Sequence, residues 1–183
     1  MRIIAVAGLA LSLSACGYNR IQTLDEQVNG FKAQIEVQLQ RRADLVPNLV
    51  EVVKGYAAQE QEIFDAVTGA RAALSGAVQS GNLADMAAAN GTLTSALGRL
   101  IAIAEDNPEI KSNENFRMLQ DQLEGTENRI AVARQDYNTA VREYNAYIRA
   151  FPQVLTAKAT GASAREYFEA DAAAQAAPEV KFD

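Results

Sequence analysis

Apolar residues recur at steps of three and four along most of the chain, which is the period of one face of an α-helix. The runs cover about residues 18–42, 44–79, 83–105 and 112–150. The fourth run is the most regular, because six large apolar residues in it stand seven apart: Phe116, Leu123, Ile130, Tyr137, Tyr144 and Phe151. Such a heptad series predicts a long helix whose apolar seam packs against neighbouring helices.

Polar residues and prolines mark the expected ends of these helices. We expect Asp44 to cap the second helix and Pro47 to lie in its first turn, where a missing N–H group costs little. Asn82 is a good N-cap for the third helix, and the break 106–108 precedes the fourth. Four amphipathic helices with short connections predict an all-α fold, an antiparallel up-and-down four-helix bundle with long helices. A single kinked helix through Pro47 is the competing layout, disfavoured because much of its face would lack partners.

The first residues have the pattern of a secretory signal, with a basic Arg2, an apolar stretch over residues 3–13 and small residues before Cys16. The stretch is too short to span a bilayer as a helix. Cys16 is the chain's single cysteine, and its setting resembles the bacterial lipobox, in which the thiol is alkylated by diacylglycerol and the chain is cut before it. Gly17 resembles the residue of lipoproteins that are sent to the outer membrane, where the host has one.

These features predict three segments. Residues 1–15 are expected to be a lipoprotein signal peptide, and residues 16–155 the helical bundle. Residues 156–183 are expected to be an Ala-rich C-terminal tail, partly extended. The mature protein would then be held by lipid on a membrane of the bacterial cell envelope, facing the periplasm or the exterior.

Composition excludes several classes of function. The chain has 23 acidic and 17 basic residues, a net charge of −6, so neither nucleic acid nor anionic lipid headgroups are expected to bind it by charge. It has no histidine, which removes the usual general base near neutral pH and the commonest ligand of zinc, copper and iron. Phosphate-binding loops and catalytic triads are also missing from the sequence. We therefore expect no enzymatic activity, cofactor or metal.

Two sets of polar residues are candidates for a site. The first lies on or beside the apolar seams and comprises Glu60, Glu127, Arg134, Asn138 and Asn145. It predicts either a buried network that fixes helix register or a polar pocket for a ligand. The second comprises Arg41, Arg42, Asp44 and Asn48, at the expected junction of the first two helices. These residues either serve the two helix ends or form a polar docking patch.

Several motifs resemble the LemA family: residues 18–21, 41–50, 53–57, 125–131 and 151–152. The resemblance implies a bacterial protein with an antiparallel four-helix bundle, and no shared enzymatic activity has been established for the family. Most members carry an N-terminal membrane helix, which a lipobox replaces here, and a magnetosome-associated branch is known. Gln59 stands where the family often has histidine, so a role that needs an imidazole at that position is not expected.

The pattern and the resemblance together favour a non-enzymatic scaffold or adaptor that binds envelope proteins. The alternative is a periplasmic sensor that binds a small ligand or peptide in a polar bundle interior. A carboxylate-based hydrolase is a third and weaker hypothesis, because it requires a paired, pKa-shifted carboxylate in an open cleft.

Overall fold

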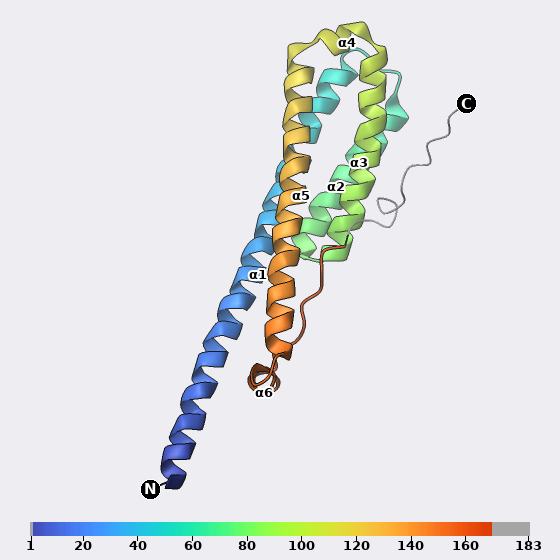
Figure 1. Ribbon diagram of the computed structural model, residues 1–183. Helices are drawn as coiled ribbons and strands as arrows, with labels where there is room; N and C mark the ends of the chain where they lie inside the picture. The colour runs from blue at the N-terminus through green and yellow to red at the C-terminus, as the bar shows by residue number, and fades with distance from the viewer. Residues whose placement is uncertain (1, 170–183) are drawn as a thin grey trace, which may run out of the picture. The chain divides into compact units, whose positions relative to one another are not determined.

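The computed structural model describes the backbone of residues 2–169 and the side chains of residues 17–169. Within these residues every regular element is an α-helix, as the sequence predicts (Figure 1). The helices are α1 (Arg2–Lys54), α2 (Gln61–Ser80), α3 (Leu83–Asp106), α4 (Pro108–Ser112), α5 (Glu114–Arg149) and α6 (Gln153–Thr160). The short helices α4 and α6 were not expected from the apolar pattern. Residues 170–183, half of the expected tail, lie outside the described residues, and α6 extends into its start.

Helix α1 contradicts the predicted break at residues 43–44. It continues without interruption through Pro47 and ends at Lys54. Asp44 is therefore not an N-cap; its carboxylate accepts a hydrogen bond from Gln40 Nε2 at 2.8 Å, one turn earlier in the same helix. The discarded alternative of a helix through Pro47 is right over residues 18–54, and the break falls between Lys54 and Gln61.

A neighbouring helix explains why Pro47 does not end α1. A proline inside a helix has no N–H group, so the carbonyl four residues earlier loses its partner. That carbonyl belongs to Ala43, and it accepts a hydrogen bond from Arg71 Nε of α2 at 3.0 Å. The buried Ala43 carbonyl is therefore satisfied from another helix.

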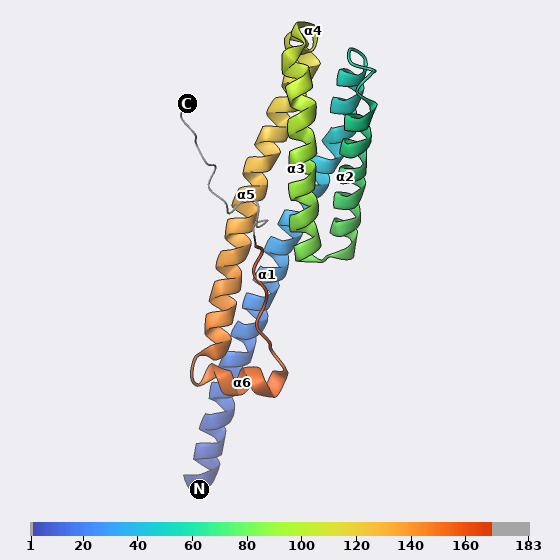
Figure 2. The same ribbon diagram turned by 90° about the vertical axis from the view of Figure 1, so that its right-hand side faces the viewer.

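The described residues form two compact units, which we describe separately. Unit 2 contains residues 35–131 with 168–169, and unit 1 contains residues 2–34 with 132–167. In unit 2, α2 packs against α3, and α3 packs against α4. Helices α2 and α3 run antiparallel and are joined by a tight turn (Figure 2).

The caps at this turn and at the next connection follow from residue type. Gly81 adopts φ 69°, a left-handed conformation that glycine adopts without steric cost, and closes α2. Asn82 is the predicted N-cap of α3 and accepts hydrogen bonds from the N–H groups of Ala84 and Asp85. Asn107 ends α3 and caps α4 through the N–H of Glu109. The sequence therefore predicts the Asn82 cap and the end of α3 correctly, because short polar side chains satisfy the first N–H groups of a helix. It does not predict α4 or the cap of that helix by Asn107.

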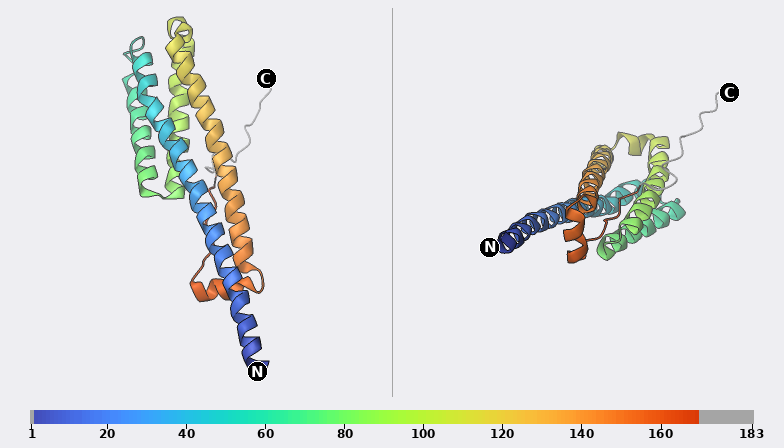
Figure 3. Two further views of the ribbon diagram at one scale, coloured as in Figure 1. Left: turned by 90° about the vertical axis from the view of Figure 1, so that its left-hand side faces the viewer. Right: turned by 60° about the horizontal axis from the view of Figure 1, so that its bottom comes forward.

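Unit 1 contains the first part of α1, the last part of α5, and α6. The apolar positions predicted from the sequence are buried here, at Ile21, Leu24 and Val28 of α1 and at Tyr137 and Tyr144 of α5. The prediction is wrong for Phe151, the last member of the heptad series, because α5 ends at Arg149 and the Phe151 side chain is 82% exposed. Helix α6 follows α5 after a sharp turn and lies across α1 (Figures 2 and 3). The chain then continues over residues 162–169 without helix or strand.

Candidate functional site

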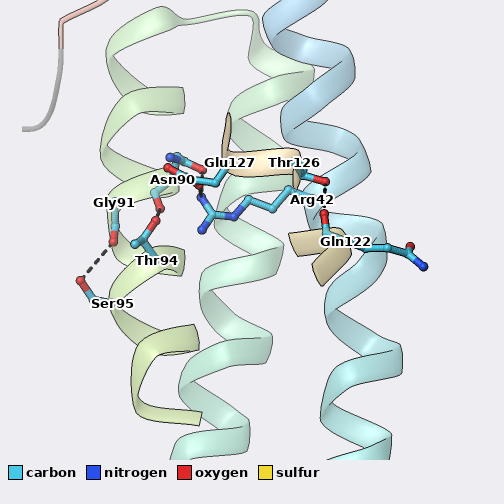
Figure 4. Close-up of polar contacts among 8 residues, drawn as sticks. All are labelled: Arg42, Asn90, Gly91, Thr94, Ser95, Gln122, Thr126 and Glu127. Atoms are coloured by element: carbon cyan, nitrogen blue, oxygen red, sulfur yellow. Dashed lines mark hydrogen bonds and ion pairs between the residues drawn. The ribbon is translucent and has the colours of Figure 1, made fainter. Parts of the chain in front are cut away.

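A buried arginine occupies the interior of unit 2. Arg42 of α1 is only 5% exposed. Its Nη1 donates a hydrogen bond to Asn90 Oδ1 of α3 at 2.6 Å and lies 2.5 Å from Glu127 Oε2 of α5. Figure 4 shows the guanidinium reaching from α1 to these two side chains. One charged side chain therefore links three helices.

The residues of this layer occupy positions where the seams are otherwise apolar. Arg42 follows Leu39 by three residues and precedes Val46 by four. Asn90 takes the equivalent place in α3, and Thr126 takes it in α5, where its hydroxyl donates to the Gln122 carbonyl at 2.7 Å. A polar layer across apolar seams is a device that fixes the register of helices, because any shift leaves the buried groups without partners.

Burial changes the pKa of the charged residue in this layer, Arg42. Loss of solvent lowers the pKa of Arg42 from its ordinary value, while the charge and hydrogen bonding of Glu127 oppose that change. An arginine remains protonated in proteins, so Arg42 is a buried cation. The Glu127 side chain is 45% exposed and keeps contact with solvent. Arg42 Nε is buried and has no hydrogen-bond partner among the described residues.

The two sequence-derived sets are rearranged by the fold. The sequence predicts Arg42 either at a helix end or in a docking patch, but it lies inside unit 2 and pairs with Glu127 from the polar-network set. Glu60 is the N-cap residue of α2, half-buried, with no capping hydrogen bond from its side chain. The sequence does contain a sign of this pairing: Arg42 and Asn90 are polar residues at positions where the helical period calls for a buried apolar residue.

A second polar cluster belongs to unit 1. Asn145 is buried and binds the backbone of Arg165 twice, by donating to its carbonyl at 2.9 Å and accepting from its N–H at 2.8 Å. The Arg165 guanidinium donates to both carboxylate oxygens of Asp25 at 2.9 Å, and the Tyr137 hydroxyl donates to the Glu166 carbonyl at 2.9 Å. Sequence reasoning identified Asn145 and missed Arg165, because the tail gave no periodic signal.

Two further members of the polar-network set, Arg134 and Asn138, are half-buried in unit 1. The rest of the docking-patch set is on the surface. Arg41, Asp44 and Asn48 are all exposed on α1. Their spacing of three and four residues places them on one face of the helix.

The remaining features concern the anchor and metals. Cys16 lies in α1, but its side chain is outside the described residues. Among the helices described here, none combines the length and the apolar character that crossing a membrane requires. Over the same residues, no group of three or more His, Cys, Asp or Glu side chains is placed to hold a metal ion.

Long helices joined by short turns, with a polar layer inserted into their apolar seams, define an all-α helical protein. Within that class the chain belongs to the LemA family, whose sequence pattern matches residues 32–182.

Two relatives give the scale of the similarity. The chain is 31% identical over 175 residues to "Magnetosome protein MamQ 2" of Paramagnetospirillum magneticum, a match that covers 83% of this chain and 64% of the relative. It is 29% identical over 174 residues to "Magnetosome protein MamQ" of Magnetospirillum gryphiswaldense, which covers 82% of this chain and 64% of that protein. The chain therefore matches less than two thirds of the length of these relatives.

Proposed function

We propose that this protein is a lipid-anchored scaffold or adaptor of the bacterial cell envelope, without enzymatic activity of its own. The observation that carries the proposal is the use of the interior polar groups. Arg42 is engaged by Asn90 and Glu127, and Asn145 by the backbone of Arg165. Polar groups that bind one another in this way fix the helix register and stabilise the fold. Partner proteins would then bind the exposed surface.

The anchor in this proposal is an acylated Cys16. Its support is the signal-like sequence before it, and two or more acyl chains are sufficient for stable membrane attachment. Metabolic labelling with a palmitate analogue tests it: the wild-type chain is expected to carry label in the membrane fraction, and Cys16→Ser is expected to carry none. Equal labelling of the two chains would remove the lipoprotein assignment.

The docking face in this proposal is the exposed set Arg41, Asp44 and Asn48. A photo-crosslinking amino acid at Asp44 in the membrane-anchored protein is expected to give one reproducible adduct with an envelope protein. Gln79, exposed on α2 of the same unit, is the matched control position. Adducts that are absent, or identical at the two positions, would contradict an adaptor role for this face.

We infer further that α1, α2, α3 and α5 form an antiparallel four-helix bundle within unit 2. Its support is the set of links among the four helices: Arg42 joins α1 to α3 and α5, and Arg71 joins α2 to α1. Packed helix axes are about 10 Å apart. Spin labels at exposed Asp44 and Glu124, in a Cys16→Ser background, are therefore expected to give short distances across α1 and α5. Broad, long distances would exclude the bundle.

One observation favours the alternative of a periplasmic ligand sensor. Arg42 Nε is buried without a protein partner among the described residues, and a donor of this kind can bind a carboxylate. In that case acetate or a short peptide raises the melting temperature of the wild-type protein and not that of Arg42→Met. An equal response of the two chains would leave the scaffold as the sole proposal.

A further inference from the structure

The chain is acidic as a whole, but one region of unit 1 has the opposite character. Residues 144–165 contain Arg149, Lys158 and Arg165 and no Asp or Glu, in a chain with a net charge of −6. Arg165 pairs with Asp25, so the exposed positive charge of this region rests on Arg149 and Lys158. The segment that contains α6 is therefore basic, although the chain as a whole is acidic.

The same region exposes large apolar side chains. Phe151, in the turn before α6, is 82% exposed, and Leu155 of α6 is 61% exposed. An exposed aromatic and an exposed aliphatic residue beside cations are the features of an element that lies in the headgroup region of a bilayer. The side chain of Ala157, by contrast, is buried, so α6 keeps one face against the protein.

The position of α6 relative to the expected anchor is defined by a contact within unit 1. A Cβ atom added to Gly17 of α1 would lie 3.4 Å from Thr156 Oγ1 of α6. Gly17 is the residue directly after Cys16, so α6 packs beside the point at which the acylated chain would begin. An acyl group on Cys16 would enter the bilayer. Because Gly17 directly follows Cys16 and packs beside Thr156, only a short distance separates the acylated residue from α6. The bilayer surface must then lie close to α6.

We propose that α6 and the turn before it form a membrane-contact element that inserts Phe151 and Leu155 into the interface of an anionic bilayer, with Arg149 and Lys158 facing the headgroups. This inference rests on the proposed lipid anchor. It differs from the expectation, drawn from the net charge of the whole chain, that anionic headgroups do not bind the protein by charge. In this arrangement the lipid attaches the protein to the membrane, and α6 sets the orientation of unit 1 relative to the membrane surface.

The absence of tryptophan from the sequence allows a direct test. Phe151→Trp and Leu155→Trp each introduce a single tryptophan, which can be excited selectively over tyrosine, into the full acylated protein. The protein is reconstituted in vesicles of phosphatidylethanolamine and phosphatidylglycerol. Val37→Trp is the matched control, because Val37 is 61% exposed on α1 and lies in unit 2. For both α6-region variants we expect a blue-shifted emission and a loss of about half the intensity when brominated lipids are used. The control is expected to show neither change.

The charge contribution is tested in the Phe151→Trp background. Replacing phosphatidylglycerol by phosphatidylcholine, or introducing Arg149→Glu with Lys158→Glu, is expected to reduce the quenching by brominated lipid. Quenching that is unchanged in both arms would overturn the headgroup contact.

Vesicle flotation separates the anchor from the contact. A protein that floats with vesicles, while its Phe151→Trp and Leu155→Trp variants emit as in water, overturns the contact and leaves the anchor intact. A blue shift without quenching by brominated lipid means that protein covers the site, which also overturns it. A protein that does not float overturns both proposals.

Discussion

The buried Arg42 gives the sharpest prediction at the scale of single residues. Glu127→Gln removes the charge that balances Arg42 and keeps the shape of the side chain. The change leaves the buried Arg42 cation without a compensating charge, but Glu127 is 45% exposed and solvent screens the pair. We therefore expect a loss of about 1–2 kcal/mol in the free energy of unfolding, measured with urea. Glu124→Gln is the control, because Glu124 is exposed on the same helix. A similar small effect in both variants would contradict a structural role for the pair.

The sequence could have identified this layer more completely than it did. Both Arg42 and Asn90 stand at steps of three and four within buried aliphatic series, and a polar residue at such a step is a candidate for the interior. The assignment of Arg42 to the surface followed from the expected helix end nearby. Once α1 continues through that point, its side chain must face the seam.

Tyr137 is expected to make the free energy of unfolding decrease at alkaline pH. Burial raises its pKa above the ordinary value of 10.0, Arg165 opposes the rise and Glu166 adds to it. Between the two pKa values the folded chain retains a proton that the unfolded chain has lost, so stability falls as pH rises above 10.0. In Tyr137→Phe the alkaline decline in unfolding free energy is expected to be shallower. The variant also loses the bond to the Glu166 carbonyl, at a cost of about 1 kcal/mol at neutral pH.

The exposed tyrosine Tyr56 supplies the control, as Tyr56→Phe in the same titration. An alkaline decline that Tyr137→Phe leaves unaltered would show that this phenol is not responsible. The measurement is the unfolding midpoint in urea at several pH values above neutrality.

At the scale of elements, α1 shows where prediction from a single helix fails. Pro47 normally indicates the start of a helix, and the sequence alone contains no sign that Arg71, in another helix, replaces its missing hydrogen bond. The cap at Asn82 and the break at residues 106–108 were predicted correctly because each depends on two or three consecutive residues. Hydrogen bonds between neighbouring residues can be predicted from the sequence. A carbonyl that is bonded by a side chain of another helix can be identified only from the fold.

A double-mutant cycle tests this account of Pro47. Arg71→Met removes the donor to the Ala43 carbonyl and keeps most of the side-chain volume, so it is expected to cost about 1–3 kcal/mol. In Pro47→Ala the residue 47 N–H can bond to that carbonyl within α1, so the same arginine change is expected to cost clearly less. Equal costs in the two backgrounds, by urea unfolding, would mean that Arg71 does not act through the proline gap.

At the scale of the whole molecule, each of the two units has its own polar cluster. Unit 1 holds the segment after α6 through Asn145, which binds both polar groups of the Arg165 backbone. Unit 2 holds its helices through the Arg42 layer. The sequence predicted one polar network that included both Glu127 and Asn145, because the two residues share α5. That long helix contributes to both units, and periodicity along it does not reveal where the division falls.

Hydrogen exchange distinguishes the two units. Asn145→Leu removes the acceptor for the Arg165 N–H and the donor to its carbonyl, so the amide of Arg165 is expected to lose protection by about tenfold or more. Asn128→Leu is the control, because Asn128 is exposed on the same helix and lies in unit 2. Amides around Arg42 and Asn90 are expected to retain their protection in both variants. If they lose it together with Arg165, the two units unfold as one, and each substitution in either polar cluster must then be judged by its effect on the whole chain.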